Sequence, residues 1–330
     1  MSLADRQVLV TGATGFLGGA LTRRLIAEGA RVRALARSAS KAQALEMMGV
    51  EVILGDITDA DAARRAAHGC AIVFHAAAAL NGTYEEQHPT NVTGSRIMLR
   101  AAAEAGAARF VHISTLAVYS PAYTGLVDET KAAIPGQDPY GNTKAAGEGA
   151  VRAASEETGL PYVIVRPGSI YGSGAGLWTG ALFRLATAPV TPFIGDGRAR
   201  APYIYIDDVV EMLILTAEHP AATNQTFNCV SDPSPVWRDI LTAYARVAGR
   251  APNWLSLPKG LGLALSGVLM LTAPRASLQR DAPDYLHFIT KPDKQFSMAK
   301  ARGLLGWEPQ VDLETGIAAC AGYLRAKGLL

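Results

Sequence analysis

The stretch Val8-Leu9-Val10-Thr11-Gly12-Ala13-Thr14-Gly15-Phe16-Leu17-Gly18 decides the fold. Its first residues are apolar and β-branched and predict a strand, and the apolar positions Leu17, Leu21 and Leu25 predict an amphipathic helix after it. Glycines at this spacing permit a tight turn, close approach of the backbone to a pyrophosphate, and close packing of helix on strand. The helix N-terminus offers N–H groups and partial positive charge to phosphates. The stretch therefore predicts a dinucleotide-binding turn.

Strands and helices alternate through the first half of the chain. Such alternation predicts a parallel sheet covered by helices on both faces. We therefore expect an α/β fold, a Rossmann-type doubly wound parallel sheet with a smaller C-terminal substrate domain. After the first strand, the predicted strands are 32–36, 51–54, 71–76, 110–114 and 162–166, and predicted helices include 59–67, 90–105 and 140–155.

The composition of the sequence changes after Arg166-Pro167-Gly168, where Gly and Pro become frequent and the regular alternation of strands and helices ends. The run 203–209 resembles a strand that is capped into a helix, which suggests that the chain returns to the first domain there. We predict an NADP-binding domain at 1–167 with a return segment at about 200–228. The segments 168–199 and 229–330 would form the substrate-binding domain, with the substrate in the cleft at the carboxyl ends of the strands.

Composition excludes several classes of function. The 330 residues carry 31 Lys and Arg against 29 Asp and Glu, a net charge of +2, and no basic run suggests a nucleic-acid partner. The three cysteines (Cys70, Cys229 and Cys320) are far apart and lack metal-ligand spacing, so no metal site is expected. The few residues before the first strand leave no room for a signal peptide, which predicts a cytoplasmic protein.

One uncharged stretch, residues 260–273 (GLGLALSGVLMLTA), admits several interpretations. A membrane span needs about 20 apolar residues, so this stretch is too short to cross a bilayer unaided. It is either a buried helix of the second domain, a wall of an apolar substrate pocket, or a surface that dips into a membrane. Peripheral membrane contact, and with it a membrane-associated location, is therefore kept as an alternative.

Tyr140 and Lys144 lie four residues apart on a predicted helix and share one face. A phenol has an ordinary pKa of about 10, and an ammonium group beside it is expected to lower that pKa. The phenol can then act as general acid to a carbonyl or general base to an alcohol. Ser114-Thr115 stands at the end of a predicted strand 25 residues before Tyr140 and supplies hydroxyl groups to the same site.

Together these motifs resemble those of an extended short-chain dehydrogenase/reductase of the NAD-dependent epimerase/dehydratase family, over nearly the whole chain. The likeness is greatest to the 3β-hydroxysteroid dehydrogenase, sterol-carboxylate dehydrogenase and dihydroflavonol reductase branch. The runs that carry it are Thr11–Gly18, Gly55-Asp56-Ile57, Phe74-His75-Ala76-Ala77-Ala78, Asn91-Val-Thr-Gly94, Ser114–Tyr119, Arg166–Gly172 and Ala299-Lys-Ala-Arg…Leu305-Gly306-Trp307-Glu-Pro309.

The resemblance implies roles for individual residues. Tyr140 would move the proton, Lys144 would hold the ribose hydroxyls and tune Tyr140, and Thr115 would orient the substrate oxygen. With Tyr140 and Lys144, the implied cofactor-binding residues are Gly12, Thr14, Gly15, Phe16, Leu17, Gly18, Arg37, Asp56, Ile57, Ala76, Ala77, Ala78, Asn91, Ser114, Pro167, Ser169 and Ile170. With Thr115, the implied substrate-binding residues are Ala79, Ala117, Gly168 and Trp178.

The end of the second predicted strand bears on the cofactor. NAD-preferring relatives place an acid there to accept from the ribose 2′-hydroxyl. This chain has Ala36 followed by Arg37, and a guanidinium suits a 2′-phosphate, with Ser38, Ser40 and Lys41 nearby. The sequence predicts NADP(H), with NAD(H) as the alternative.

Departures from the family pattern bear on the substrate. Leu116-Ala117 replaces the Asp-Glu pair of nucleotide-sugar dehydratases, and Ser169 and Ala201 replace the Asn and Arg that grip a diphosphate in sugar-nucleotide epimerases. An apolar substrate pocket is favoured by the residues Leu177-Trp178 and Leu182-Phe183 and by the stretch 260–273. We predict an NAD(P)H-dependent oxidoreductase that interconverts a ketone and a secondary alcohol on an apolar small molecule such as a 3-oxo lipid or a sterol. The alternatives are a nucleotide-sugar 4-epimerase with tightly bound NAD and a non-catalytic NADP-binding regulator. We also expect a homodimer.

Overall fold

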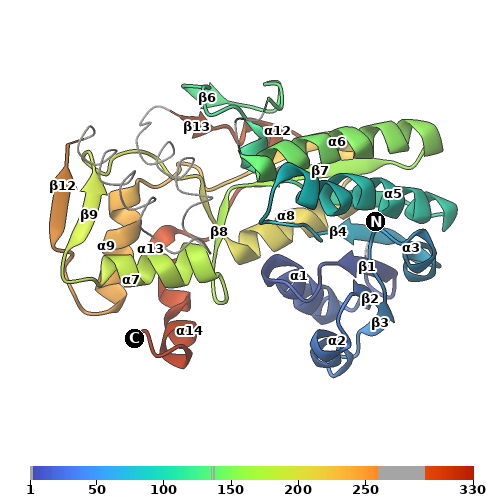
Figure 1. The fold of residues 1–330 in the computed structure, drawn as a ribbon, viewed down its shortest axis with the longest axis horizontal. Coiled ribbons are helices and arrows are strands. Elements are labelled where there is room, and N and C mark those ends of the chain that lie inside the picture. Colours follow the sequence, from blue (N-terminus) through green and yellow to red (C-terminus); the bar gives the residue numbers. More distant parts are fainter. Residues whose placement is uncertain (1–2, 135, 137, 259–293) are drawn as a thin grey trace.

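The computed structural model describes residues 3–134, 136, 138–258 and 294–330. Its largest element is a seven-stranded sheet, all parallel, in the order β11-β7-β5-β4-β1-β2-β3 (Figure 1). The strands are β1 Gln7–Thr11, β2 Arg31–Ala36, β3 Glu51–Leu54, β4 Ile72–His75, β5 Arg109–Ile113, β7 Tyr162–Pro167 and β11 Gln225–Cys229.

Helices cover both faces of this sheet. One layer holds α1 Phe16–Ala27, α2 Ala39–Glu46 and α8 Ile206–Glu218, and the other holds α3 Ala60–Ala67, α5 Ser95–Glu104 and α6 Pro139–Thr158. The side chains of β1 alternate accordingly, because successive residues of a strand point to opposite faces. Val8 and Val10 pack toward α1 and α8, Leu9 packs toward α3 and α5, and all three are fully buried. The predicted Rossmann-type doubly wound sheet is confirmed.

Two local predictions differ from the structure. The expected single helix 90–105 is two pieces, the π-helical turn η1 Pro89–Gly94 and α5, and a further short helix, α4 Tyr84–His88, precedes them. Pro89 has no N–H to donate within a helix, which favours a break at this position. The strand β11 was not predicted. Its residues, Gln-Thr-Phe-Asn-Cys, form neither a continuous apolar run nor a regular alternation of apolar and polar side chains. The expected strand and helix at 203–209 are present as β10 Tyr203–Tyr205 and α8.

The chain from about residue 170 builds a second packed region, at the left of Figure 1. Its core includes Phe183, Tyr203, Trp237, Tyr244 and Ile317, all buried. Its helices are η3 Gly176–Ala181, α7 Leu182–Ala186, α9 Trp237–Val247, α13 Leu313–Ala319 and α14 Ala321–Ala326.

Three small two-stranded sheets lie outside the seven-stranded sheet. In each, two parallel strands pair: β8 Ser169–Tyr171 with β10, β9 Thr191–Ile194 with β12 Trp254–Leu257, and β6 Leu126–Val127 with β13 Gln295–Phe296. The remaining elements are α12 Ala299–Leu305 and the 3₁₀ turns η2 Leu116–Val118 and η4 Pro220–Ala222.

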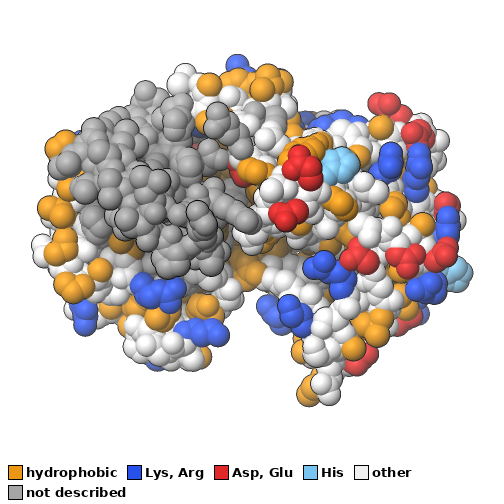
Figure 2. Space-filling view, viewed as in Figure 1, with side chains coloured by type: hydrophobic (Ala, Val, Ile, Leu, Met, Phe, Trp, Pro, Cys, Tyr) orange, Lys and Arg blue, Asp and Glu red, His pale blue; other side chains and the backbone are white. Residues whose placement is uncertain are grey.

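The surface of the sheet-containing half carries charges of both signs close together (Figure 2). Several of them pair, as Arg64 does with Asp61 and Glu104 and Arg100 does with Glu157. The predicted apolar stretch 260–273 lies outside the described residues. Within the described part of the chain, no helix is long and apolar enough to cross a membrane.

Candidate active site

The turn between β1 and α1 has the close contacts that its glycines were expected to allow. Gly12 has a positive φ of 74°, and a Cβ there would lie 2.7 Å from the Ala77 backbone nitrogen and 2.8 Å from the Ala76 carbonyl oxygen. A Cβ on Gly18 would lie 2.2 Å from the Gly12 carbonyl oxygen. Side chains at these positions would separate β1, the end of β4 and α1, so the glycines keep these three backbones in contact.

The first turn of α1 faces this same edge of the sheet. Gly15 is the N-cap residue and provides no side-chain cap, and Thr14 and Gly15 are exposed while Phe16 and Leu17 are half-buried. The first N–H groups of a helix lack partners within the helix and attract anions. An open, uncapped helix start beside a cradle that any Cβ would fill fits a pyrophosphate group.

The segment after β4 is fixed by buried polar side chains. The Thr11 hydroxyl accepts from the Ala77 N–H (3.2 Å) and bonds the His75 Nδ1 (2.9 Å). The Asn91 side chain accepts from the Ala79 N–H (2.8 Å) and donates to the Ala79 carbonyl (2.9 Å) and to Thr143 Oγ1 (2.9 Å). Asn91 therefore fastens the predicted substrate-facing residue Ala79 to α6, while Ala76, Ala77 and Ala78 stay half-buried beside the turn. A direct contact of Asn91 with the cofactor stays a prediction.

The start of α6 brings the predicted catalytic residues together. The Asp138 carboxylate caps the helix by accepting from the backbone N–H groups of Tyr140 (3.0 Å) and Gly141 (2.9 Å). Gly141 permits a close approach, since a Cβ there would lie 2.5 Å from the Ala117 carbonyl oxygen. Thr115 Oγ1 accepts from the Ala117 N–H (3.2 Å), and the Thr115 side chain lies near enough to the Tyr140 phenol to lower its pKa. Thr115, Ala117 and Tyr140 thus form one site.

Lys144 lies one turn further along α6 and is 2% exposed. Its Nζ donates to the Ile113 carbonyl at the end of β5 (2.7 Å). Burial lowers the pKa of Lys144 to about 8, and the Glu148 carboxylate opposes this shift. Burial raises the pKa of Tyr140, as does Asp138, while the hydrogen bond from Thr115 lowers it. The expectation that Lys144 lowers the Tyr140 pKa is wrong for this structure, because the Lys144 ammonium is held at β5 and burial of the phenol dominates.

Ser114 was predicted to contact the cofactor, but its hydroxyl has another partner. It is 4% exposed and donates to Glu148 Oε1 at 2.6 Å. The side chain of Ser114 is therefore engaged in the protein interior. Sequence reasoning missed Glu148, although the spacing Tyr140, Lys144, Glu148 places all three on one helix face.

The end of β2 is open to solvent. The Arg37 side chain is 75% exposed, and its Nη1 lies 3.9 Å from Asp56 Oδ2. Asp56 Oδ1 accepts from the backbone N–H (2.9 Å) and hydroxyl (2.8 Å) of Thr58, while Ile57 beside it is buried. Arg37 and Asp56 thus lie close together at the end of β2, and their contact with an adenosine stays a prediction.

The chain leaves the sheet after β7 through a close contact. Pro167 is the last residue of β7, and a Cβ on Gly168 would lie 2.0 Å from the Pro202 carbonyl oxygen. Ser169 and Ile170 follow in β8, with the Ser169 N–H bonded to Pro202. Trp178 lies further on in η3, its ring tilted against Trp237 and its carbonyl accepting from the hydroxyls of Tyr203 and Tyr244. Trp178 therefore joins the second packed region.

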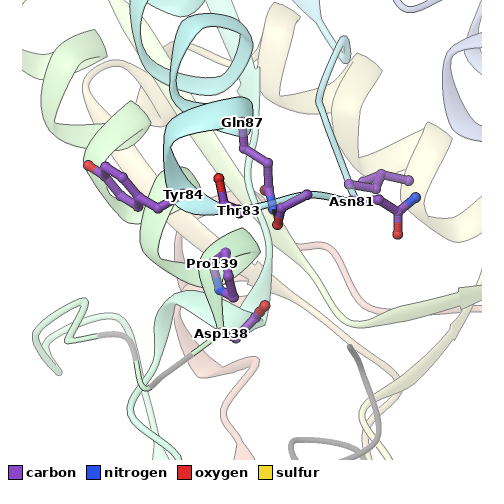
Figure 3. A pocket seen from close by; sticks show the side chains of 8 residues that line it. Asn81, Thr83, Tyr84, Gln87, Asp138 and Pro139 are labelled. Atoms are coloured by element: carbon purple, nitrogen blue, oxygen red, sulfur yellow. Dashed lines mark hydrogen bonds between the residues drawn. The ribbon is translucent and has the colours of Figure 1, made fainter. Parts of the chain in front are cut away.

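A cavity of about 270 Å³ opens beside the start of α6 (Figure 3). Asp138 and Pro139 form one wall, and the loop and helix after β4 form the other. Among the described residues, no group of three or more His, Cys, Asp or Glu side chains could hold a metal ion. The site is thus built from a nucleotide-binding turn, a Thr-Tyr-Lys group and a neighbouring cavity.

Comparison with known proteins identifies the family. The sequence model of the "NAD dependent epimerase/dehydratase family" matches residues 8–229, more than half of the chain and all of the turn and Thr-Tyr-Lys segments. The chain belongs to this family. It is an enzyme of the extended short-chain dehydrogenase/reductase type, and the family uses a nicotinamide cofactor.

Individual members of the epimerase/dehydratase family are similar over nearly the full chain. A ceramide reductase of Caulobacter vibrioides is 31% identical over 92% of this chain and 86% of its own length. A 2-alkyl-3-oxoalkanoate reductase of Stenotrophomonas maltophilia is 31% identical over 94% and 97%. The structure of a Thermotoga maritima UDP-glucose 4-epimerase with UDP-glucose superposes with a TM-score of 0.74 at 24% identity, covering 97% of this chain and 99% of that one, which shows a shared fold.

Proposed function

We propose that the chain is an NADP(H)-dependent reductase that interconverts a ketone and a secondary alcohol on an apolar small molecule. The observation that carries this proposal is the placement of Thr115 beside Tyr140 at the start of α6, with Lys144 buried one helical turn away. The cofactor would supply the hydride, and the protein would supply the geometry and the proton.

Tyr140 is suited to the reductive direction. Because burial raises its pKa, the phenol remains protonated at neutral pH and can donate its proton to a carbonyl oxygen as negative charge develops there. Thr115, beside the phenol, would hold the same substrate oxygen and fix its distance from the proton. Lys144 would hold the ribose hydroxyls from the β5 side of the site.

The residues around the cofactor region fit NADP(H). The uncapped start of α1 and the contacts at Gly12 and Gly18 fit the pyrophosphate. The Arg37 guanidinium is exposed and only loosely paired, so it is free to form a fork with a 2′-phosphate. An acid that would accept from a free 2′-hydroxyl is replaced at this position by the buried Ala36.

Several features favour an apolar substrate over a nucleotide sugar. Ala201 is fully buried, and the nearby Arg200 donates to the Ser234 carbonyl (2.7 Å), so neither presents a charge to a diphosphate. The names of the two reductase relatives refer to a ceramide and a 3-oxoalkanoate, both lipids. We further propose that the described parts of 168–199 and 229–330 form the substrate side of the cleft.

A comparison of two substrate classes tests this function. NADPH consumption would be followed with ethyl 3-oxodecanoate and 3-oxosteroids, and UDP-glucose would be tested at millimolar concentration for thermal stabilisation and 4-epimerisation. We expect saturable NADPH oxidation with the ketones, increasing with chain length because each buried methylene contributes about 0.8 kcal/mol. Stabilisation by UDP-glucose with formation of its 4-epimer would instead establish the epimerase alternative.

A further inference from the structure

Glu148 continues the helix face that carries Tyr140 and Lys144, and it is completely buried. Its carboxylate accepts four hydrogen bonds. Oε1 accepts from Ser114 Oγ (2.6 Å) and Arg166 Nε (2.8 Å), and Oε2 accepts from Arg166 Nη2 (2.6 Å) and Arg152 Nη2 (3.1 Å). Ser114 immediately follows β5, Arg166 lies in β7 and Arg152 lies in α6, so one carboxylate joins three parts of the fold.

The joined positions are next to the residues of the active site. Ser114 immediately precedes Thr115, and Arg166 immediately precedes Pro167 at the end of β7. Arg166 also donates to the Tyr119 hydroxyl (2.7 Å), which donates to Asn228 Oδ1 (2.8 Å) in β11. The Glu148 carboxylate therefore holds the ends of β5 and β7 at a fixed distance from α6, where the geometry of Thr115, Tyr140 and Lys144 is set.

Glu148 also lies one helical turn from Lys144, and its carboxylate opposes the lowering of the Lys144 pKa by burial. Although burial raises its pKa, the bonds from Arg166, Ser114 and Arg152 bring the pKa of Glu148 below its ordinary value, so it is ionised. The other groups that face Lys144 offer no negative charge. His75 and His112 are buried and neutral, since burial and the charge of Lys144 lower their pKa values, and Arg152 and Arg166 are cations already paired with Glu148.

We propose that Glu148 is a positioning residue for the reaction, acting as a buried clamp that aligns Thr115 with Tyr140 and as the counter-charge that keeps Lys144 an ammonium ion. The kinetic part of this inference rests on the proposed ketone reduction. A purely structural ion pair would stabilise the fold without affecting the ionisation of Lys144 or the alignment of the site, so the two interpretations give different results.

The central variant is Glu148→Gln, which keeps the shape and a hydrogen-bond acceptor but removes the charge. The control is Arg109→Gln at the opposite end of β5, where the guanidinium donates to the Thr216 and His219 carbonyls of a structural contact. Three quantities are measured for both: denaturant unfolding, kcat and KM for ethyl 3-oxodecanoate with NADPH, and the pH titration of Lys144. The titration uses NMR of proteins with 13C-labelled lysine, with the Lys144 signal assigned from the Lys144→Met variant.

For Glu148→Gln we expect kcat to fall by about tenfold or more, because small misalignments of reacting groups are costly, with KM and NADPH affinity nearly unchanged. The Lys144 titration should move below the wild-type value of about 8, since the opposing carboxylate charge is lost. Arg109→Gln should lower stability without changing kcat or the titration. Unchanged kcat and Lys144 titration in a folded Glu148→Gln protein would overturn the proposal.

A second variant covers the case in which Glu148→Gln does not fold. Glu148→Asp keeps the charge but shortens the reach, so it should leave the Lys144 titration near that of the wild type while lowering kcat. Wild-type kcat in Glu148→Asp would contradict the clamp, and an altered titration would contradict the counter-charge. If the wild-type protein does not reduce the ketone, the proposed function fails, but the titration still decides whether Glu148 sets the charge of Lys144.

Discussion

The two ends of the predicted cofactor site are built in opposite ways. At the catalytic end, Lys144 and its neighbour Glu148 are buried and bonded to the ends of β5 and β7. At the adenosine end, Arg37 is 75% exposed and only 3.9 Å from Asp56 in a loose pair. The fold thus fixes the groups at the catalytic end, whereas Arg37, which is predicted to select the cofactor, is mostly exposed. Changes at the catalytic end should affect turnover, and changes at the adenosine end should affect affinity.

Tyr140→Phe should have the largest effect, because it removes the proton donor and leaves the ring in place. General acid–base catalysis contributes about 10² to 10⁴-fold, so kcat for ketone reduction should fall by that factor with NADPH affinity retained. Single-turnover absorbance measurements with a saturating ketone test this. Tyr123→Phe, on an exposed loop, is the matched control. Retention of more than a tenth of the wild-type rate, with chemistry shown to be rate-limiting, would remove Tyr140 from its assigned role.

Arg37→Ala should have the next largest effect, and it should appear in affinity alone. A hydrogen bond to a charged group contributes about 1.5–3 kcal/mol, so NADPH should bind roughly ten- to a hundredfold more weakly while NADH binding is unchanged. Fluorescence titration with both cofactors gives the comparison, and Arg31→Ala, at the opposite end of β2, is the control. If both cofactors weaken equally, the selectivity does not reside at Arg37.

The sequence predicted the features that local patterns determine, and it missed those that form only when distant segments pack together. The glycine turn, the positions of the first six strands of the sheet along the chain and the helical spacing of Tyr140 and Lys144 follow local sequence patterns, so they could be inferred from the chain. The partner of Ser114 could not, because Glu148 and Ser114 meet only when α6 packs on β5. For the same reason the direction of the Tyr140 pKa shift was mispredicted, since it depends on burial in the folded protein rather than on helical spacing. The strand β11 was not predicted because it forms by pairing with β7, and its own residues carry no clear strand pattern, whereas the change in the helix at Pro89 has a local cause that the prediction overlooked.

The free energy of unfolding should depend on pH in a way that shows the lowered pKa of the buried Lys144. Its pKa is about 8 in the folded protein against an ordinary 10.5, so the unfolded chain binds more protons between these values. The cost of burying the charge is present below pH 8 and is relieved as the pH rises toward 10.5, by up to about 1.4 kcal/mol per pH unit. Urea unfolding of the wild type and Lys144→Met, without added cofactor, should therefore give curves that diverge across this window.

The other titrating groups are the same in the wild type and in Lys144→Met, so their contributions to the pH dependence cancel when the two unfolding free energies are subtracted. Lys131→Met, at an exposed position, reports the effect of removing a surface lysine. Parallel curves for the wild type and Lys144→Met would mean that Lys144 does not bear its charge in the interior, and the contrast between the two ends of the site would lose its electrostatic basis.

The smallest effect is expected at the helix that follows Asp56. Asp59 caps α3 by accepting from the backbone N–H groups of Asp61 (2.9 Å) and Ala62 (3.3 Å). Loss of an N-cap costs about 0.5–2 kcal/mol, so Asp59→Ala should lower the free energy of unfolding by that amount and leave kcat unchanged. Asp61→Ala, on the same turn but not the cap, separates the capping bond from the loss of a carboxylate.

The adenosine end is held by such local bonds, whereas the catalytic end is held by contacts between β5, β7 and α6. A fall in kcat with Asp59→Ala comparable to that of Tyr140→Phe would therefore show that the two ends are coupled, and that the fold does not fix them separately.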